Sequence, residues 1–356
     1  MAGDGGGKRD EVSDALRAKI RNGSYPPGER LPTVREVAAE FNTSVLTVHR
    51  ALQELVEDGF IVTDGRRGTR VVEHPPHLCR YGLIVGEDPR KDGSYRTANL
   101  AASTLAASAW DQPNSTVVVY RASNTHPEPL EHQRLINDLT SGRLAGLILH
   151  ACPAVGSWLR PRELTIPVVG MPPDKRPPHW GGLHFIHVHF LDRAIDELAK
   201  TSIKRFAVLQ DAAAAGITHA EGVLKRAAAK GLDCRPERIL CAPVNNPQWV
   251  LNVVTALMQG PADDRPEALV IGDDNLLPAA SAALDTLGFA PDQCALYSMA
   301  NFPYRTPSSR AVVRIGWDHE EFLRRAVALI DRYNRDQTPI GDHAMAARPE
   351  SEHRAG

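Results

Sequence analysis

The 356-residue sequence lacks the features that identify several common classes of protein. Its five cysteines have no Cys-x-x-Cys spacing, which argues against a zinc site and against a disulfide framework. No run approaches the roughly 18 apolar residues that a membrane-spanning helix needs. The first residues also lack the apolar stretch of a secretory signal. We therefore expect a cytoplasmic protein without a membrane partner.

An excess of charge of one sign is lacking as well. The formal net charge is -2, and residues 8–74 contain 11 Lys and Arg against 11 Asp and Glu. Any positive surface must come from the placement of side chains, which is sufficient because phosphate contacts are local. No phosphate loop, nucleophile elbow or zinc-protease helix occurs in the sequence. We expect neither an enzyme nor a cofactor.

What the sequence does contain is a compact pattern of helix signals in residues 31–72. Thr33-x-x-Glu36 is a capping box, so one helix should begin at Val34. Ser44 can cap a second helix that runs to about Asp58. Apolar residues recur on the second helix at three- and four-residue steps, at Val48, Leu52, Leu55 and Val56. An earlier helix is expected over residues 11–22.

A hairpin follows the second helix. Two β-rich runs, 60–63 and 69–72, flank a basic tip bounded by glycines. Two helices at a steep angle, the second presenting polar residues from its first turns, suit the DNA major groove. The basic tip can reach phosphates or the minor groove. The alternative is a small helical cap with a solvated polar face; DNA binding is favoured because all these signals occur together and in order.

These residues also carry a family resemblance. The run G-x-Y-P-P-G-x-x-L-P-T-x-R-E-V-A from Gly23, then T-V-H-R-A-L and the glycine-bounded tip, resembles the winged-helix domain of the GntR superfamily of bacterial transcription factors. The family more often has arginine at positions 45 and 49, so the operator sequence is not implied. The resemblance and the charge placement together give these expected DNA contacts: Arg35, Ser44, Val45, Thr47, His49, Arg50, Gly65, Arg66, Arg67 and Gly68.

From Tyr81 onward, apolar strand-like runs alternate with helical segments. This alternation predicts βαβ units and parallel sheets covered on both faces. About 275 residues are too many for one small sheet, so we expect two lobes with a cleft. The run HFIHVH at 184–189 is interpreted as a half-exposed strand rather than a metal site, because no Cys or carboxylate completes a ligand set.

Residues 134–149, 166–169 and 266–298 are similar to segments of LacI-type repressors and periplasmic sugar-binding proteins. Arabinose-type repressors combine such a module with a GntR head. The resemblance implies a ligand between the lobes, where parallel sheets are also expected to bind ligands. Asp274, preceded by Asp273, falls where the family's aspartate binds sugar hydroxyls, a role that suits a carboxylate. Both aspartates can instead cap the helix expected from Leu276.

Two further residues are candidates for the effector site. His219 stands where the family usually has an arginine clamp, which disfavours an acidic or phosphorylated effector. Tyr95 follows the first expected strand of the large domain; it could stack on a ligand ring or pack in the core.

We therefore expect an α/β protein with an N-terminal winged helix-turn-helix and a bilobed periplasmic-binding-protein-like domain. The expected parts are a disordered tail (1–7), the DNA-binding domain (8–74), a linker (75–79), the ligand-binding domain (80–350) and a tail (351–356). The expected function is repression by a homodimer on a double-stranded operator, modulated by a sugar. One alternative is a constitutive DNA-binding protein whose large domain only dimerises. Another is a solute-binding module or enzyme with an incidental head.

Overall fold

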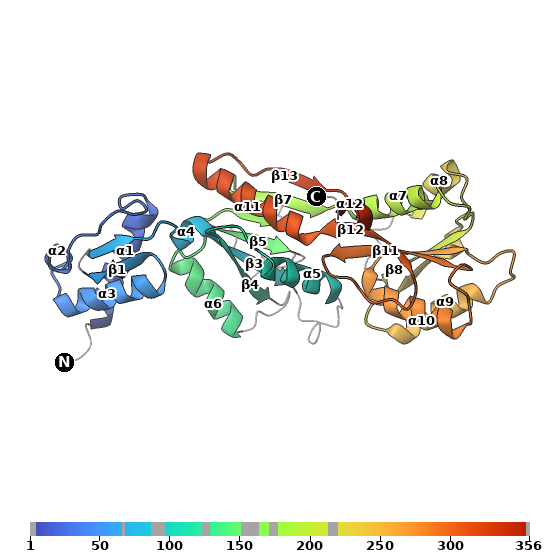
Figure 1. Cartoon of the computed structure of the whole chain (residues 1–356), viewed down its shortest axis with the longest axis horizontal. Helices are drawn as coiled ribbons and strands as arrows, with labels where there is room; N and C mark the ends of the chain where they lie inside the picture. The colour runs from blue at the N-terminus through green and yellow to red at the C-terminus, as the bar shows by residue number, and fades with distance from the viewer. Residues whose placement is uncertain are drawn as a thin grey trace.

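The computed structural model describes residues 5–65, 68–86, 97–122, 129–150, 164–170, 177–212 and 220–353. They form three bodies in a row (Figure 1): a small head, a middle lobe and a far lobe, here called the head, the N-lobe and the C-lobe. Among the described helices, none has the length and apolarity needed to cross a membrane.

The head consists of α1 (Gly5–Arg21), α2 (Val34–Glu40), α3 (Val45–Glu57), β1 (Ile61–Asp64) and β2 (Gly68–Val71). Its first helix begins well before the expected residue 11. Apolar side chains of all three helices and of the hairpin form one core, which includes Val12, Leu16, Val37, Leu52 and Phe60. The head therefore has a hydrophobic core of its own.

The hairpin is antiparallel, with Ile61 opposite Val71 and Asp64 opposite Gly68. Gly68 has φ +82°, a backbone conformation that favours glycine. Leu31 donates its backbone N–H to Thr69 at 2.9 Å and thereby ties the segment before α2 to the hairpin. After β2, the expected linker contains the one-turn helix α4 (Pro76–Cys79).

The N-lobe is built on six parallel strands in the order β13-β7-β6-β5-β3-β4. Its elements are β3 (Arg80–Gly86), α5 (Thr97–Ser108), β4 (Thr116–Ala122), α6 (Pro129–Thr140), β5 (Gly146–His150), β6 (Val168–Gly170), β7 (Trp180–Phe185), α11 (His319–Asp336) and β13 (Asp342–Met345). Successive residues of a strand face opposite sides. Leu83 accordingly joins the core under α5 and α11, and Ile84 joins the core under α6.

The C-lobe has the strand order β14-β12-β11-β10-β8-β9, parallel except for β14. Its elements are α7 (His187–Leu198), β8 (Phe206–Asp211), α8 (Ala220–Ala229), η5 (Pro236–Arg238), β9 (Ile239–Ala242), α9 (Pro247–Met258), β10 (Ala268–Ile271), η6 (Asp274–Leu276), α10 (Leu277–Thr286), β11 (Ala295–Phe302), β12 (Val312–Asp318), β14 (Arg348–Pro349) and α12 (Glu350–His353). Helices α7 and α8 pack on one face of the sheet, and α9 and α10 on the other.

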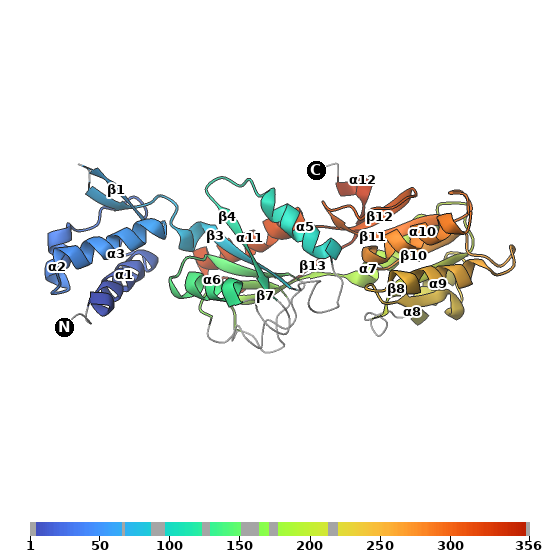
Figure 2. The same ribbon diagram turned by 90° about the horizontal axis from the view of Figure 1, so that it is seen from below.

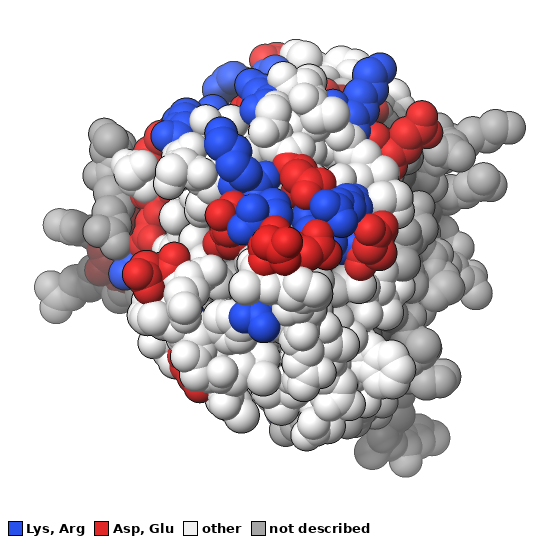
Figure 3. Space-filling view, turned by 90° about the vertical axis from the view of Figure 1, so that its right-hand side faces the viewer, with Lys and Arg blue, Asp and Glu red and all other residues white. Residues whose placement is uncertain are grey.

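The end of the C-lobe far from the head carries a cluster of alternating charges beside a broad uncharged area (Figure 3). Among the ion pairs of the C-lobe are those of Arg238, whose guanidinium lies 3.1 Å from Asp233 and 2.8 Å from Asp264.

The chain passes between the lobes three times, after β7, after β12 and after β13 (Figure 2). The prediction of two parallel α/β lobes is confirmed. The strand interpretation of the histidine-rich run is wrong in part. His184 lies in β7, but His187 and His189 lie in the first turn of α7, because the strand ends at Phe185 and the chain turns into the C-lobe there.

Candidate nucleic-acid interface and effector site

Two capped helices and a tight turn form the proposed reading element of the head. The backbone N–H of Thr33 donates to Glu36 Oε2 at 2.7 Å, and the backbone N–H of Glu36 donates to Thr33 Oγ1 at 3.4 Å, so the capping box forms as expected. Hydrogen bonds from Thr33 hold the pKa of the Glu36 carboxyl below its usual value. Ser44 caps α3 by accepting from the N–H of Thr47 at 3.1 Å.

Helix α3 buries one face and exposes the other. Its buried residues are Val48, Ala51, Leu52 and Leu55. On the remaining surface, Ser44, Val45, His49 and Arg50 are exposed and Thr47 is half-buried. Leu46 also lies there with 60% of its surface exposed. The sequence interpretation did not include this leucine, although helical spacing from Val48 and Leu52 places it on the outer face.

Two exposed arginines on α2 and α3 form no ion pair with the described residues. Within the described part of the chain, neither Arg35 on α2 nor Arg50 on α3 has a carboxylate at ion-pair distance. By contrast, Arg9, Arg17 and Lys19 on α1 are all paired with carboxylates. Arg21 at the end of α1 and Arg30 before α2 are likewise exposed and have no such partner in the described residues. Although the head is neutral by count, it therefore carries uncompensated positive charge on α2, on α3 and on the segment that joins α1 to α2, and phosphate binding requires such charge.

The hairpin tip is only partly described. Gly65 and Gly68 are exposed at the ends of the two strands, as expected for a wing. Arg66 and Arg67 lie outside the described residues, so their expected DNA contacts stay predictions.

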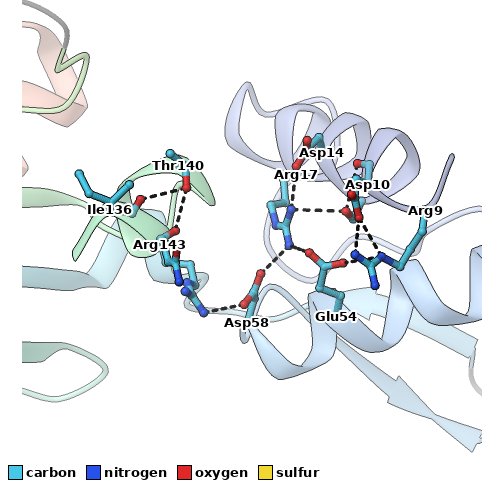
Figure 4. A network of polar contacts seen from close by, with 11 residues as sticks. Arg9, Asp10, Asp14, Arg17, Glu54, Asp58, Ile136, Thr140 and Arg143 are labelled. Atoms are coloured by element: carbon cyan, nitrogen blue, oxygen red, sulfur yellow. Dashed lines mark hydrogen bonds and ion pairs between the residues drawn. The ribbon is translucent and has the colours of Figure 1, made fainter. Parts of the chain in front are cut away.

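A chain of ion pairs runs from the head into the N-lobe (Figure 4). Arg17 on α1 contacts Asp58, the C-cap residue of α3, at 2.7 Å. Asp58 also binds Arg143 of the N-lobe at 2.7 Å, and Arg143 binds Asp138 of α6 at 2.7 Å. Helix α3 ends at Asp58, which takes part in these ion pairs. The ion pairs therefore hold α3 in place relative to the loop between α6 and β5.

Close packing supports this contact. A Cβ added at Gly142, next to Arg143, would lie 2.8 Å from the side chain of Arg21 on α1. Glycine at this position leaves room for the arginine to lie against the loop. At the far end of the chain, Asp138 is almost fully buried and contacts Arg80 at 3.1 Å and the hydroxyl of Tyr120. The chain of ion pairs thus ends in the interior of the N-lobe.

A second polar chain joins the two lobes at the carboxyl ends of their strands. Asn301 on β11 donates from Nδ2 to the two carboxylate oxygens of Asp274 at 3.1 and 3.2 Å. Its Oδ1 lies 3.2 Å from His319 Nε2, and His319 Nδ1 lies 3.0 Å from Ser103 on α5. The backbone N–H of Ala98 at the start of α5 adds a direct bond to Asn275 of the C-lobe at 3.1 Å.

Burial changes the acid–base properties of this chain. It raises the pKa of Asp274 to about 7, because the charged form is disfavoured in the interior and Asp273 places a second negative charge nearby. It also holds the pKa of His319 well below its usual value, with His150 as a further cause. The His150 and His319 rings lie 4.8 Å apart, and Phe185 and Phe322 pack edge-on around them. The junction between the lobes therefore combines buried polar groups with packed aromatic rings.

The two aspartates expected in the effector site, Asp273 and Asp274, have different roles in the structure. Asp273 caps η6, the short turn before α10, by accepting from the N–H of Asn275 at 2.9 Å, whereas α10 itself begins at Leu277 without a side-chain cap. Asp274 is 2% exposed and accepts from Asn301 and Thr306. His219 and Tyr95 lie outside the described residues. Asn301, His319 and Ser103 were missed by sequence reasoning, since no local pattern indicates that these distant residues meet.

The structure thus combines a winged helix-turn-helix head with a bilobed parallel α/β domain. Residues 8–71 match the family model described as bacterial regulatory proteins, gntR family. The head is therefore similar to the domain that this family of bacterial regulatory proteins shares.

The curated proteins match only a part of this chain. The histidine utilization repressor of Klebsiella aerogenes is 38% identical over 64 residues, which are 18% of this chain and 27% of that protein. The chain spans about half or less of the curated relatives it matches first.

Among solved structures, a ribose operon repressor from Burkholderia thailandensis has a TM-score of 0.53 at 19% identity, covering 76% of this chain and 98% of that one. The regulator CelR in complex with cellobiose has a TM-score of 0.56 at 16% identity, covering 90% and 98%. The large domain thus has the LacI-type fold.

Proposed function

We propose that the protein is a transcription repressor that binds a double-stranded DNA operator through its head and a small polar ligand, most simply a sugar, between its lobes. The observation that carries DNA binding is the pair of exposed, unpaired arginines beside the open face of α3. A homodimer would place two heads on adjacent half-sites of the operator.

The sugar proposal is supported by the chemistry between the lobes. A buried carboxyl, an amide and aromatic rings are the groups that bind hydroxyls and the apolar faces of a sugar ring. The related fold of the CelR–cellobiose complex is consistent with this ligand class. The ion-pair chain from Asp138 to Asp58 offers a route by which a change in the N-lobe alters the position of the head.

The DNA-binding part is tested by fluorescence anisotropy with genomic fragments, including those that flank the protein's own gene. We expect Arg35→Ala and Arg50→Ala each to weaken binding about tenfold or more and to reduce its salt dependence. Arg9→Ala is the matched control, since Arg9 is exposed but already paired with Asp10. Equal binding by all three variants would contradict the proposed interface.

One observation favours a second candidate, a constitutive DNA-binding regulator. Both carboxylate oxygens of Asp274 already accept hydrogen bonds from within the protein. Thermal denaturation with a panel of sugars separates the two functions, because a ligand that binds only the folded protein raises its melting temperature. No shift with any sugar, together with intact operator binding, would favour the constitutive regulator.

A further inference from the structure

Exposed apolar side chains begin the helix that is proposed to enter the major groove. Val45 is 47% exposed and Leu46 is 60% exposed. Both directly follow the cap residue Ser44, so they occupy the first turn of α3, the part of such a helix that approaches base edges. Leu46 also lies one turn before Arg50, which places its side chain next to that unpaired cation.

An apolar side chain has one complementary group on the base edges of the major groove. Guanine, cytosine and adenine present hydrogen-bond donors and acceptors there, which leucine and valine cannot use. Thymine alone adds a methyl group at C5. We infer that Leu46, assisted by Val45, reads thymine methyl groups and so sets operator specificity at that base pair. This inference rests on the proposed DNA-binding function.

The surrounding residues support this occupant over a protein partner. Arg50 is exposed without an ion-pair partner in the described chain, and Gln53 is exposed one turn further along the same outer face of α3. Such polar and cationic neighbours suit phosphates and base edges, whereas protein-binding patches are depleted of charge at their centre. Leu46 therefore lies on a surface that combines apolar, polar and cationic side chains, and such a surface is complementary to the major groove of DNA.

The test uses DNA fragments selected by the wild-type protein from a random library. Each thymine is replaced in turn by deoxyuracil, which keeps every hydrogen-bonding group and removes only the methyl. We expect wild-type affinity to fall about fourfold at one thymine per half-site, as for the loss of one buried methyl. Leu46→Ala should bind the thymine fragment more weakly and show no further loss with deoxyuracil.

Leu130→Ala is the control, because Leu130 is an exposed leucine of the N-lobe. This variant should keep the full deoxyuracil effect. If Leu46→Ala retains wild-type affinity, or the same deoxyuracil sensitivity as the wild type, the inference is wrong while DNA binding stands. If the wild-type protein selects no fragment at all, the proposed function itself fails.

Discussion

At the scale of single residues, Asp274 is a carboxyl group that the fold holds almost entirely out of water. It is 2% exposed, and its hydrogen-bond donors are the neutral side chains of Asn301 and Thr306. Ionisation of a carboxyl in such a site is opposed by the loss of hydration and by the neighbouring Asp273. The folded protein therefore favours the protonated form up to about neutral pH.

This shift predicts a pH dependence of stability. Between pH 4 and the pKa of about 7, the folded state keeps the proton on Asp274 and the unfolded state has lost it. The contribution of Asp274 to the free energy of unfolding should then fall as the pH rises, by about 1.4 kcal/mol per pH unit. Asp274→Asn, which imitates the neutral form, should remove this fall when urea denaturation is measured from pH 4.5 to 8.

Asp285→Asn supplies the comparison for that measurement. Hydrogen bonds from Ser309 and Arg310 hold the pKa of Asp285 below its usual value, so this carboxyl stays ionised throughout that range. Its substitution should leave the pH slope unchanged. A wild-type slope identical to that of Asp274→Asn would show that the buried carboxyl does not titrate there.

At the scale of elements, the predictable parts are those whose signal is local. The capping box at Thr33 and the Ser44 cap correctly locate α2 and α3, because both signals lie within one turn of the helix they start. Several strands were missed for an equally physical reason. β13 is Asp-His-Ala-Met and shows no apolar run, whereas β9 is apolar but has only four residues, three of them half-buried.

The candidate site was predictable to a similar extent. The reading helix and Asp274 are found from sequence because caps and family motifs mark them. The partners of Asp274 are not found, because Asn301 and His319 meet it only when β11 and α11 are brought together by the fold. Long-range pairing of this kind leaves no trace in residue spacing.

The contact between α3 and the N-lobe loop gives a prediction for these elements. Arg143→Gln removes the bond to Asp58 while leaving Arg17 in place. We expect limited proteolysis of residues 73–79 to become faster, because the head is then held to the N-lobe less firmly. Lys200→Gln removes an exposed ion pair with Glu197 in the C-lobe. In this variant, residues 73–79 should be cleaved at the wild-type rate. Equal rates for both variants would show that the ion pair does not restrain the head.

At the scale of the whole molecule, the lobes are joined by covalent crossings and by the Asp274–Asn301–His319–Ser103 chain. Asn301 holds the centre of that chain and is 3% exposed. Its removal leaves buried polar partners without a hydrogen bond, which costs about 1–3 kcal/mol.

We therefore predict that Asn301→Leu lowers the free energy of unfolding by about this amount and shifts the lobes apart. Small-angle scattering should record a larger radius of gyration. Asn252→Leu on α9 is the control, because Asn252 is exposed and remote from the lobe junction. An unchanged radius for Asn301→Leu, alongside the loss of stability, would limit the residue to a role within the C-lobe.

The three passages of the chain between the lobes have a practical consequence for engineering. Neither lobe is encoded by one uninterrupted stretch, since α11 and β13 return to the N-lobe from the end of the sequence. The head, in contrast, is contiguous and has a separate core. Grafting the head onto a foreign sensor should succeed where excising either lobe fails. A chimera whose sensor carries an arginine at the place of Arg143 would also keep the ion pair with Asp58 of the head.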